Sequence, residues 1–297
     1  MKGDLFIYPQ QLPEPIAEVP LYRTTPHKTY AHRLQTAREA FSDRLQLYSR
    51  LFNTQTEPRD KGGVVLFQEA DYTLEVYRPS DSLRWTCQEL AYRNHMPAEA
   101  QLPTEQEALE LATNHLREYR LDTHYTQFKS IAYSELSITN AVSKKTAVYR
   151  TEINVLYNFK LEGHPIFGPG AKIKLSFVEG GRRSRLLYFW RVPQREKMIS
   201  IISPEEALKK FSRDRRFRKL SPDTAGVNVQ SLQFGYYALP PTEFQRFLIP
   251  VYRVEGTVKT ECIESQSFTL HVVAVNLTPE QIMEAGVVAN PASCTVF

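Results

Sequence analysis

The chain has 297 residues, of which 42% are hydrophobic and 24% charged, as in a typical folded globular protein. The net charge of +4 is too weak for a dedicated nucleic-acid binder, so no nucleic acid is expected as a partner. Cys87, Cys262 and Cys294 are odd in number and widely separated, which excludes a disulfide-rich scaffold. No apolar run approaches the roughly 18 residues of a membrane-spanning helix.

The first predicted unit, residues 1–100, contains a helix followed by a hairpin. Apolar residues recur at helical spacing from Tyr30 to Tyr48, which predicts an amphipathic helix. Two β-rich runs, 64–67 and 72–77, follow the Gly62-Gly63 pair and predict a β-hairpin.

The second predicted unit, residues 101–202, repeats this order. Thr104 and Glu107 have the spacing of a capping box, which predicts a helix from Glu105 to about Tyr119. Four β-rich segments follow, at 125–138, 146–160, 171–178 and 185–191.

The third predicted unit, residues 203–297, begins with a second capping box, formed by Ser203 and Glu206 around Pro204. Further strands are predicted at 227–239, 247–258 and 267–275, and a short closing helix at 278–281. The expected fold class is therefore α+β, built from three repeated modules of a helix and an antiparallel sheet.

The sequence predicts no catalytic residue, metal site or cofactor. It contains no GxSxG, Walker or GxGxxG motif and no HExxH or Cys/His cluster. The seven histidines show no spacing typical of paired metal ligands. They are His27, His32, His95, His115, His124, His164 and His271.

Four residues are binding candidates. The segment 163–170 is rich in glycine and proline and is interpreted either as a rigid turn or as a recognition loop that presents His164 and Phe167. Tyr188 and Trp190 belong to an aromatic cluster that either fills the core or lines a protein-binding groove.

A basic run follows the third predicted helix. Arg213, Arg215, Arg216 and Arg218 form either a solvated helix end, where the macrodipole favours cations, or a contact with an anionic membrane surface or an acidic partner.

The region from Thr104 to Phe211 resembles PepSY-like modules and the extracytoplasmic regulatory proteins of the YycH/YycI type. The shared run includes 155–159, 161–168, 171–178 and the helix start at 203–207. The resemblance implies cystatin-like modules with a binding, inhibitory or regulatory role and no catalytic residues. It also implies an extracytoplasmic location, with the signal or anchor absent from this chain; a cytoplasmic location is the alternative.

Together these patterns predict a non-catalytic binding or regulatory protein that presents the face or edge of an antiparallel sheet to a protein partner. Peripheral membrane contact is a further possibility, and the sequence leaves the oligomeric state open. The alternative is a small-molecule pocket enzyme that carries out proton transfer or a cyclisation in a cavity between a helix and a curved sheet.

Overall fold

A computed structural model describes residues 6–24, 59–68, 71–91, 101–119, 121, 123–214, 224–260 and 265–275. Strands account for 55% of the described residues and helices for 15%. The predicted α+β fold class of repeated, cystatin-like modules is therefore wrong, because the chain is predominantly β. The helices predicted at 30–48 and 278–281 lie outside the described residues.

The two helix starts predicted from capping boxes are confirmed. Helix α3 (Glu105–Glu118) begins where the Thr104 hydroxyl accepts a hydrogen bond from the Glu107 backbone N–H at 3.3 Å. The Glu107 carboxylate accepts in return from the Thr104 backbone N–H at 2.8 Å. The same reciprocal pair starts α4 (Pro204–Ser212). Each box satisfies two N–H groups that the helix itself leaves unpaired.

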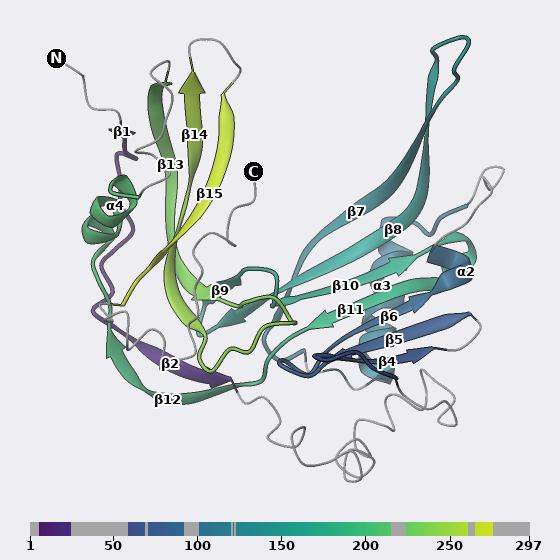
Figure 1. The fold of residues 1–297 in the computed structure, drawn as a ribbon, viewed down its shortest axis with the longest axis horizontal. Helices are drawn as coiled ribbons and strands as arrows, with labels where there is room; N and C mark the ends of the chain where they lie inside the picture. Colours follow the sequence, from purple (N-terminus) through teal and green to yellow (C-terminus); the bar gives the residue numbers. More distant parts are fainter. Residues whose placement is uncertain are drawn as a thin grey trace.

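Among the described residues, thirteen strands form one mixed sheet (Figure 1). Its main path is β15 (Gln266–Val273), β14 (Ile249–Thr260), β13 (Thr224–Tyr237), β9 (His164–Phe167), β8 (Thr146–Leu161), β10 (Lys172–Phe177), β11 (Arg183–Phe189), β6 (Ser82–Cys87), β5 (Tyr72–Tyr77), β4 (Val64–Gln68) and β3 (Arg59–Asp60). The strand β1 (Phe6–Ile7) pairs with β13, and β7 (Thr126–Thr139) pairs with β8. A separate two-stranded ribbon joins β2 (Glu18–Thr24) to β12 (Pro193–Ser200).

The short strand β9 explains why the modules are not separate. It pairs antiparallel with β8, where His164 faces Leu161, and parallel with β13, where Ile166 faces Tyr236. At this junction a Cβ added to Gly235 would lie only 2.4 Å from the Pro165 carbonyl oxygen, so glycine permits the close approach. The predicted central and C-terminal units therefore share one continuous sheet.

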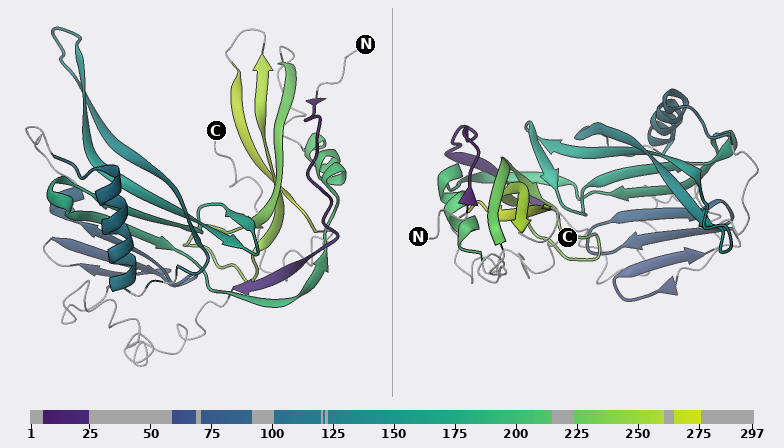
Figure 2. Two further views of the ribbon diagram at one scale, coloured as in Figure 1. Left: turned by 180° about the vertical axis from the view of Figure 1, so that it is seen from behind. Right: turned by 90° about the horizontal axis from the view of Figure 1, so that it is seen from above.

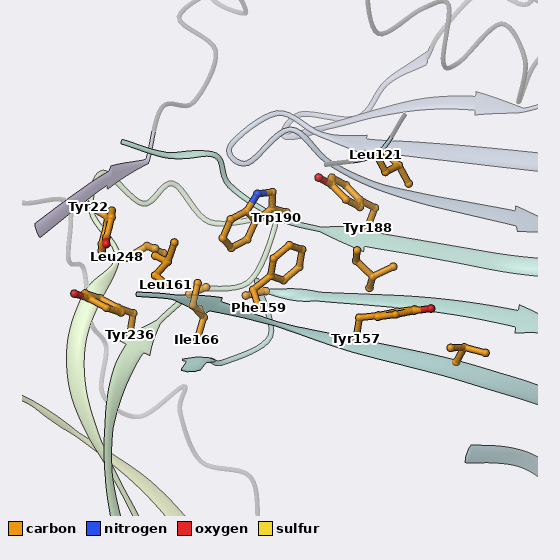
Figure 3. Close-up of a cluster of buried hydrophobic side chains, with 14 of the residues drawn as sticks. Tyr22, Leu121, Tyr157, Phe159, Leu161, Ile166, Tyr188, Trp190, Tyr236 and Leu248 are labelled. Atoms are coloured by element: carbon orange, nitrogen blue, oxygen red, sulfur yellow. The ribbon is translucent and has the colours of Figure 1, made fainter. Parts of the chain in front are cut away.

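The molecule has two lobes with one continuous core. One lobe contains β13, β14 and β15 with α4 beside them, and the other contains β4, β5, β6, β8, β10 and β11 with α3 on one face (Figures 1 and 2). Between them Trp190 stacks on Phe159 with ring centroids 3.9 Å apart, and Tyr22 meets Tyr236 edge-on at 5.3 Å (Figure 3). The first pair lies on the side of β8 and β11 and the second on the side of β2 and β13, and all four residues belong to one buried cluster that joins the lobes.

Candidate functional site

The helix α3 covers one face of its lobe and leaves the other uncovered by it. Tyr133 of β7 donates a hydrogen bond to Glu105 of α3 at 3.4 Å, and Phe177 of β10 stacks with His115 of α3 at 5.8 Å. Both pair with Ile153 of β8, so these three residues mark the covered face. Because side chains alternate along a strand, the intervening residues of β8 lie on the opposite face, which we call the open face.

The pairing register defines the open face across five strands. Its residues share rows with Asn154, Leu156 and Asn158 of β8. They are Gln127, Ser130 and Ala132 of β7, Lys172, Lys174 and Ser176 of β10, Arg185, Leu187 and Phe189 of β11, and Arg84 and Thr86 of β6.

A buried polar network closes one corner of the open face. The Glu152 carboxylate accepts hydrogen bonds from Ser184 at 2.7 Å, Ser134 at 3.1 Å and Arg185 at 3.3 Å. Arg185 also donates to the carbonyl of Ala91, at the end of α2 (Gln88–Ala91), at 2.9 Å. The carboxylate is therefore fully engaged in holding strands and α2 together, as a buried charge requires.

Beside this network lies a group of cations, the lysine patch, made of Lys129, Lys172 and Lys174. Lys172 and Lys174 are half-buried and stand two residues apart on β10, so both project from the open face. Neither forms an ion pair with any of the residues that the structure describes. Burial is the largest influence on both and lowers their pKa; Lys129 lowers that of Lys172 further. For Lys174 the Glu152 carboxylate raises the pKa in part, and Arg185 and Lys172 lower it.

The pair β7–β8 extends past the rest of the sheet as a two-stranded arm, residues 135–150 (Figure 1). The strand β10 pairs with β8 only from Ile153 onward. Before Ile153, β8 pairs with β7 and with no other described strand. Along its whole length β7 pairs with no other described strand, and its outer edge is open.

One face of the arm is apolar and the other polar. Leu136 pairs with Tyr149 and Ile138 with Ala147, on the side that continues the open face. Leu136, Ile138 and Tyr149 remain 45%, 43% and 42% exposed. The opposite side is mainly polar: it carries the Glu135–Arg150 ion pair at 3.8 Å and the Thr139–Thr146 hydrogen bond at 2.9 Å, together with one exposed apolar side chain, Val148, which pairs with Ser137. The arm and the open face therefore form one surface, on which the exposed apolar side chains of the arm lie next to the lysine patch.

The four residues predicted to bind a partner lie elsewhere and do not gather on one surface. Phe167, Tyr188 and Trp190 are only 7%, 9% and 3% exposed. Phe167 packs with Tyr237 and neighbouring core residues, whereas Trp190 packs on Phe159 (Figure 3). Direct contact with a partner would require three of the four to leave the core.

His164 is half-buried at the start of β9, edge-on to the Phe234 ring at 4.9 Å. Burial lowers its pKa, against a smaller opposing effect of Glu162. The unfolded chain therefore binds a proton at a higher pH than the folded chain, and stability should fall as the pH drops below the ordinary histidine value of about 6.5. Urea unfolding at pH 7.5 and 5.5 should show a smaller pH-dependent loss for His164→Leu than for the unmodified protein. An equal loss in both proteins would contradict this prediction.

The predicted basic contact falls mostly outside the described part of the chain. Arg213 is the C-cap of α4, whereas Arg215, Arg216 and Arg218 are not among the described residues. The hypothesis of an anionic-surface contact there stays a prediction.

Sequence reasoning missed the arm and the lysine patch. Apolar and polar residues alternate in Leu136-Ser137-Ile138 as they do in any half-buried strand, so the sequence does not indicate that Leu136 and Ile138 are exposed. The one available signal was Lys172-Ile173-Lys174, because strand alternation puts two like charges on one face. That spacing favours a functional charge patch over a packed face.

Two further features of the described residues bear on function. No described helix is long and apolar enough to cross a membrane. Within the same residues, no group of three or more His, Cys, Asp or Glu side chains is arranged to hold a metal ion.

The fold and site place this chain among predominantly β proteins with a large mixed sheet and a protruding arm. No family model matches the chain, and no curated protein does. A solved structure of an uncharacterized protein from Eubacterium rectale ATCC 33656 is similar in fold, with a TM-score of 0.50 and 12% sequence identity. The match covers 91% of this chain and 88% of that chain. At this identity the likeness concerns the fold alone.

Proposed function

We propose that this chain is a non-catalytic binding protein that presents the apolar face of the arm, together with the adjoining open face, to a protein partner. The proposal keeps the binding role expected from the sequence and moves it from four candidates, three of them buried, to the exposed apolar side chains of the arm and the half-buried lysines of the open face.

The exposure of the arm carries the proposal. A two-stranded ribbon is at best marginally stable alone in water, because it has no sheet or helix against which to bury its apolar face. Here that face exposes Leu136, Ile138 and Tyr149 side by side, with the open edge of β7 beside them. Adjoining exposed apolar side chains and an unpaired strand edge are typical of surfaces that bind another polypeptide.

The enzyme alternative has less support. Its best candidate for an acid or base is Glu152, the buried carboxylate of the open face. All three of its hydrogen-bond donors belong to the protein itself, on strands that the network ties together. A carboxylate accepts about four hydrogen bonds, so these three donors leave Glu152 little capacity to take a proton from a substrate.

A photo-crosslinking side chain such as p-benzoylphenylalanine tests the proposal when it replaces one residue at a time in cells of the source organism. At Leu136, on the apolar face, it should yield one discrete crosslinked protein. At Ser137, the next residue and on the polar face, it should yield at most about a tenth of that product, because adjacent strand residues point in opposite directions. The yield is measured on denaturing gels, and the product is identified by mass spectrometry.

The companion variant Ile138→Asp places a charge in the proposed interface without touching the core, because Ile138 is exposed. It should abolish the crosslink from Leu136 while the protein melts at an unchanged temperature. Equal crosslinking from the two faces, or a crosslink that persists in Ile138→Asp, would refute the proposed function.

A further inference from the structure

We propose that the partner contacts the lysine patch with an extended acidic segment, whose carboxylates meet Lys129, Lys172 and Lys174 on the open face. This inference rests on the proposed function and adds the chemistry of the partner.

The charge balance of the open face points to an anionic partner. Two carboxylates on this side of the sheet are already engaged: Glu152 by its buried network, and Glu75 of β5 by the Tyr77 hydroxyl at 2.6 Å and by Arg84 at 3.9 Å. The lysine patch is left with no carboxylate at ion-pair distance within the described chain. An interface completes such a patch by supplying the opposite charge.

The half-burial of Lys172 and Lys174 supports the same conclusion. Lysine is usually a fully hydrated surface residue, and holding two of them two residues apart and partly out of water opposes folding. The structure keeps both nonetheless. Lys174 pairs with Leu156 and Leu187 in the neighbouring strands. Lys172 has the Phe189 ring 5.6 Å from its ammonium group, which supplies a weak cation–π contact and no counter-charge. A patch that is unfavourable in the free protein becomes favourable once a carboxylate sits on it.

The spacing of Lys172 and Lys174 favours a partner segment in an extended conformation. Residues two apart on a strand are separated by about 6.7 Å and point to the same side. Every second side chain of an extended peptide has the same repeat, so alternate carboxylates of such a peptide match the two lysines. Leu156 and Leu187, beside Lys174, can contact the aliphatic parts of such a peptide.

A nucleic acid is the less favoured anion. Single strands bind mostly by stacking bases on exposed aromatic rings, and the aromatic residue of the open face, Phe189, is buried. A bilayer is also less favoured, because the patch lies on the sheet beside the arm and not at its tip, where Val142 is 93% exposed.

The probe for the test is a fluorescein-labelled ten-residue peptide of alternating Glu and Thr, with a Gln-Thr peptide as its uncharged match. Fluorescence anisotropy at 20 mM NaCl should show that the full chain binds the Glu-Thr peptide at least ten times more tightly than the Gln-Thr peptide. Raising the salt to 300 mM should remove most of this preference by screening.

The double variant Lys172→Gln/Lys174→Gln should lose at least tenfold in affinity for the Glu-Thr peptide. Its melting temperature should stay the same or rise by about 1–3 °C, because two partly buried like charges are gone, so the loss cannot be attributed to unfolding. The matched control is Lys144→Gln/Lys145→Gln, which removes two exposed lysines from the arm and should leave the affinity within twofold.

Three results would overturn the inference. The first is no preference for the Glu-Thr peptide, and the second is an equal loss of affinity in both double variants. The third is that a ten-residue thymidine strand or phosphatidylglycerol vesicles bind as tightly as the Glu-Thr peptide, in a way that depends on Lys172 and Lys174. Each of them leaves the crosslinking result from Leu136 standing, so failure of the inference is distinguishable from failure of the proposed function.

Discussion

Replacing Arg191 by methionine should lower the free energy of unfolding by about 4 kcal/mol, a larger effect than any other single exchange of a charged residue considered for this chain. Arg191 follows β11, is only 3% exposed, and its guanidinium group donates to three backbone carbonyls of the segment after β13. The distances are 2.9 Å to Leu239, 2.8 Å to Pro240 and 2.7 Å to Glu243.

The effect is large because the variant leaves all three carbonyls without their donor while methionine fills the space. Burial lowers the Arg191 pKa to about 10, against an opposing effect of Glu243, so the guanidinium group stays charged at neutral pH and its three carbonyl partners offset its lost hydration. Chemical denaturation measures the loss. Arg195→Met is the matched control, because Arg195 is well exposed, pairs with Glu162 at 3.4 Å, and should change stability by less than about 1 kcal/mol. Similar losses of unfolding free energy in the two variants would show that the hydrogen bonds from Arg191 to the segment after β13 do not stabilise the contact between the lobes.

The parts of this fold that the sequence predicts are those encoded by near neighbours. A capping box needs only residues three apart, so Thr104 with Glu107 and Ser203 with Glu206 located both helix starts correctly. Strand positions were also largely recognisable, because alternation and β-branched residues are local properties. Strand partners are not local: β2 pairs with β12, more than 160 residues later, and nothing in either segment specifies the other.

The candidate site could not be predicted for a related reason. Ile173 and Leu175 alternate along their strand in the same way as Leu136 and Ile138, yet the first pair is fully buried and the second about half exposed. Alternation establishes that two side chains share a face, and says nothing of what covers that face. The same limit placed Phe167 and Trp190 among binding residues, although aromatic side chains between two lobes fill the core.

Two glycines in the segment 163–170 should separate the rigid-turn interpretation from the recognition-loop interpretation. Gly163 and Gly168 both have a positive φ, +83° and +89°, so alanine is strained at either position by about 1 kcal/mol. A Cβ at Gly163 meets no atom within 4 Å, whereas at Gly168 it would lie 2.4 Å from the Ala238 carbonyl oxygen.

Gly168→Ala should therefore lower the free energy of unfolding by about 2–4 kcal/mol and Gly163→Ala by only about 1 kcal/mol, since overpacking adds about 1–3 kcal/mol to the strain. Ala238 cannot move away easily: its N–H donates to the Phe167 carbonyl at 2.9 Å, and its own carbonyl accepts from the Gly170 N–H at 3.2 Å. Urea titrations of the pair give the difference directly. Equal, small losses would mean that the segment adjusts easily, as a recognition loop does. The expected gap of about 1–3 kcal/mol would instead identify the end of β9 and the residues after it as a rigid segment packed against the end of β13.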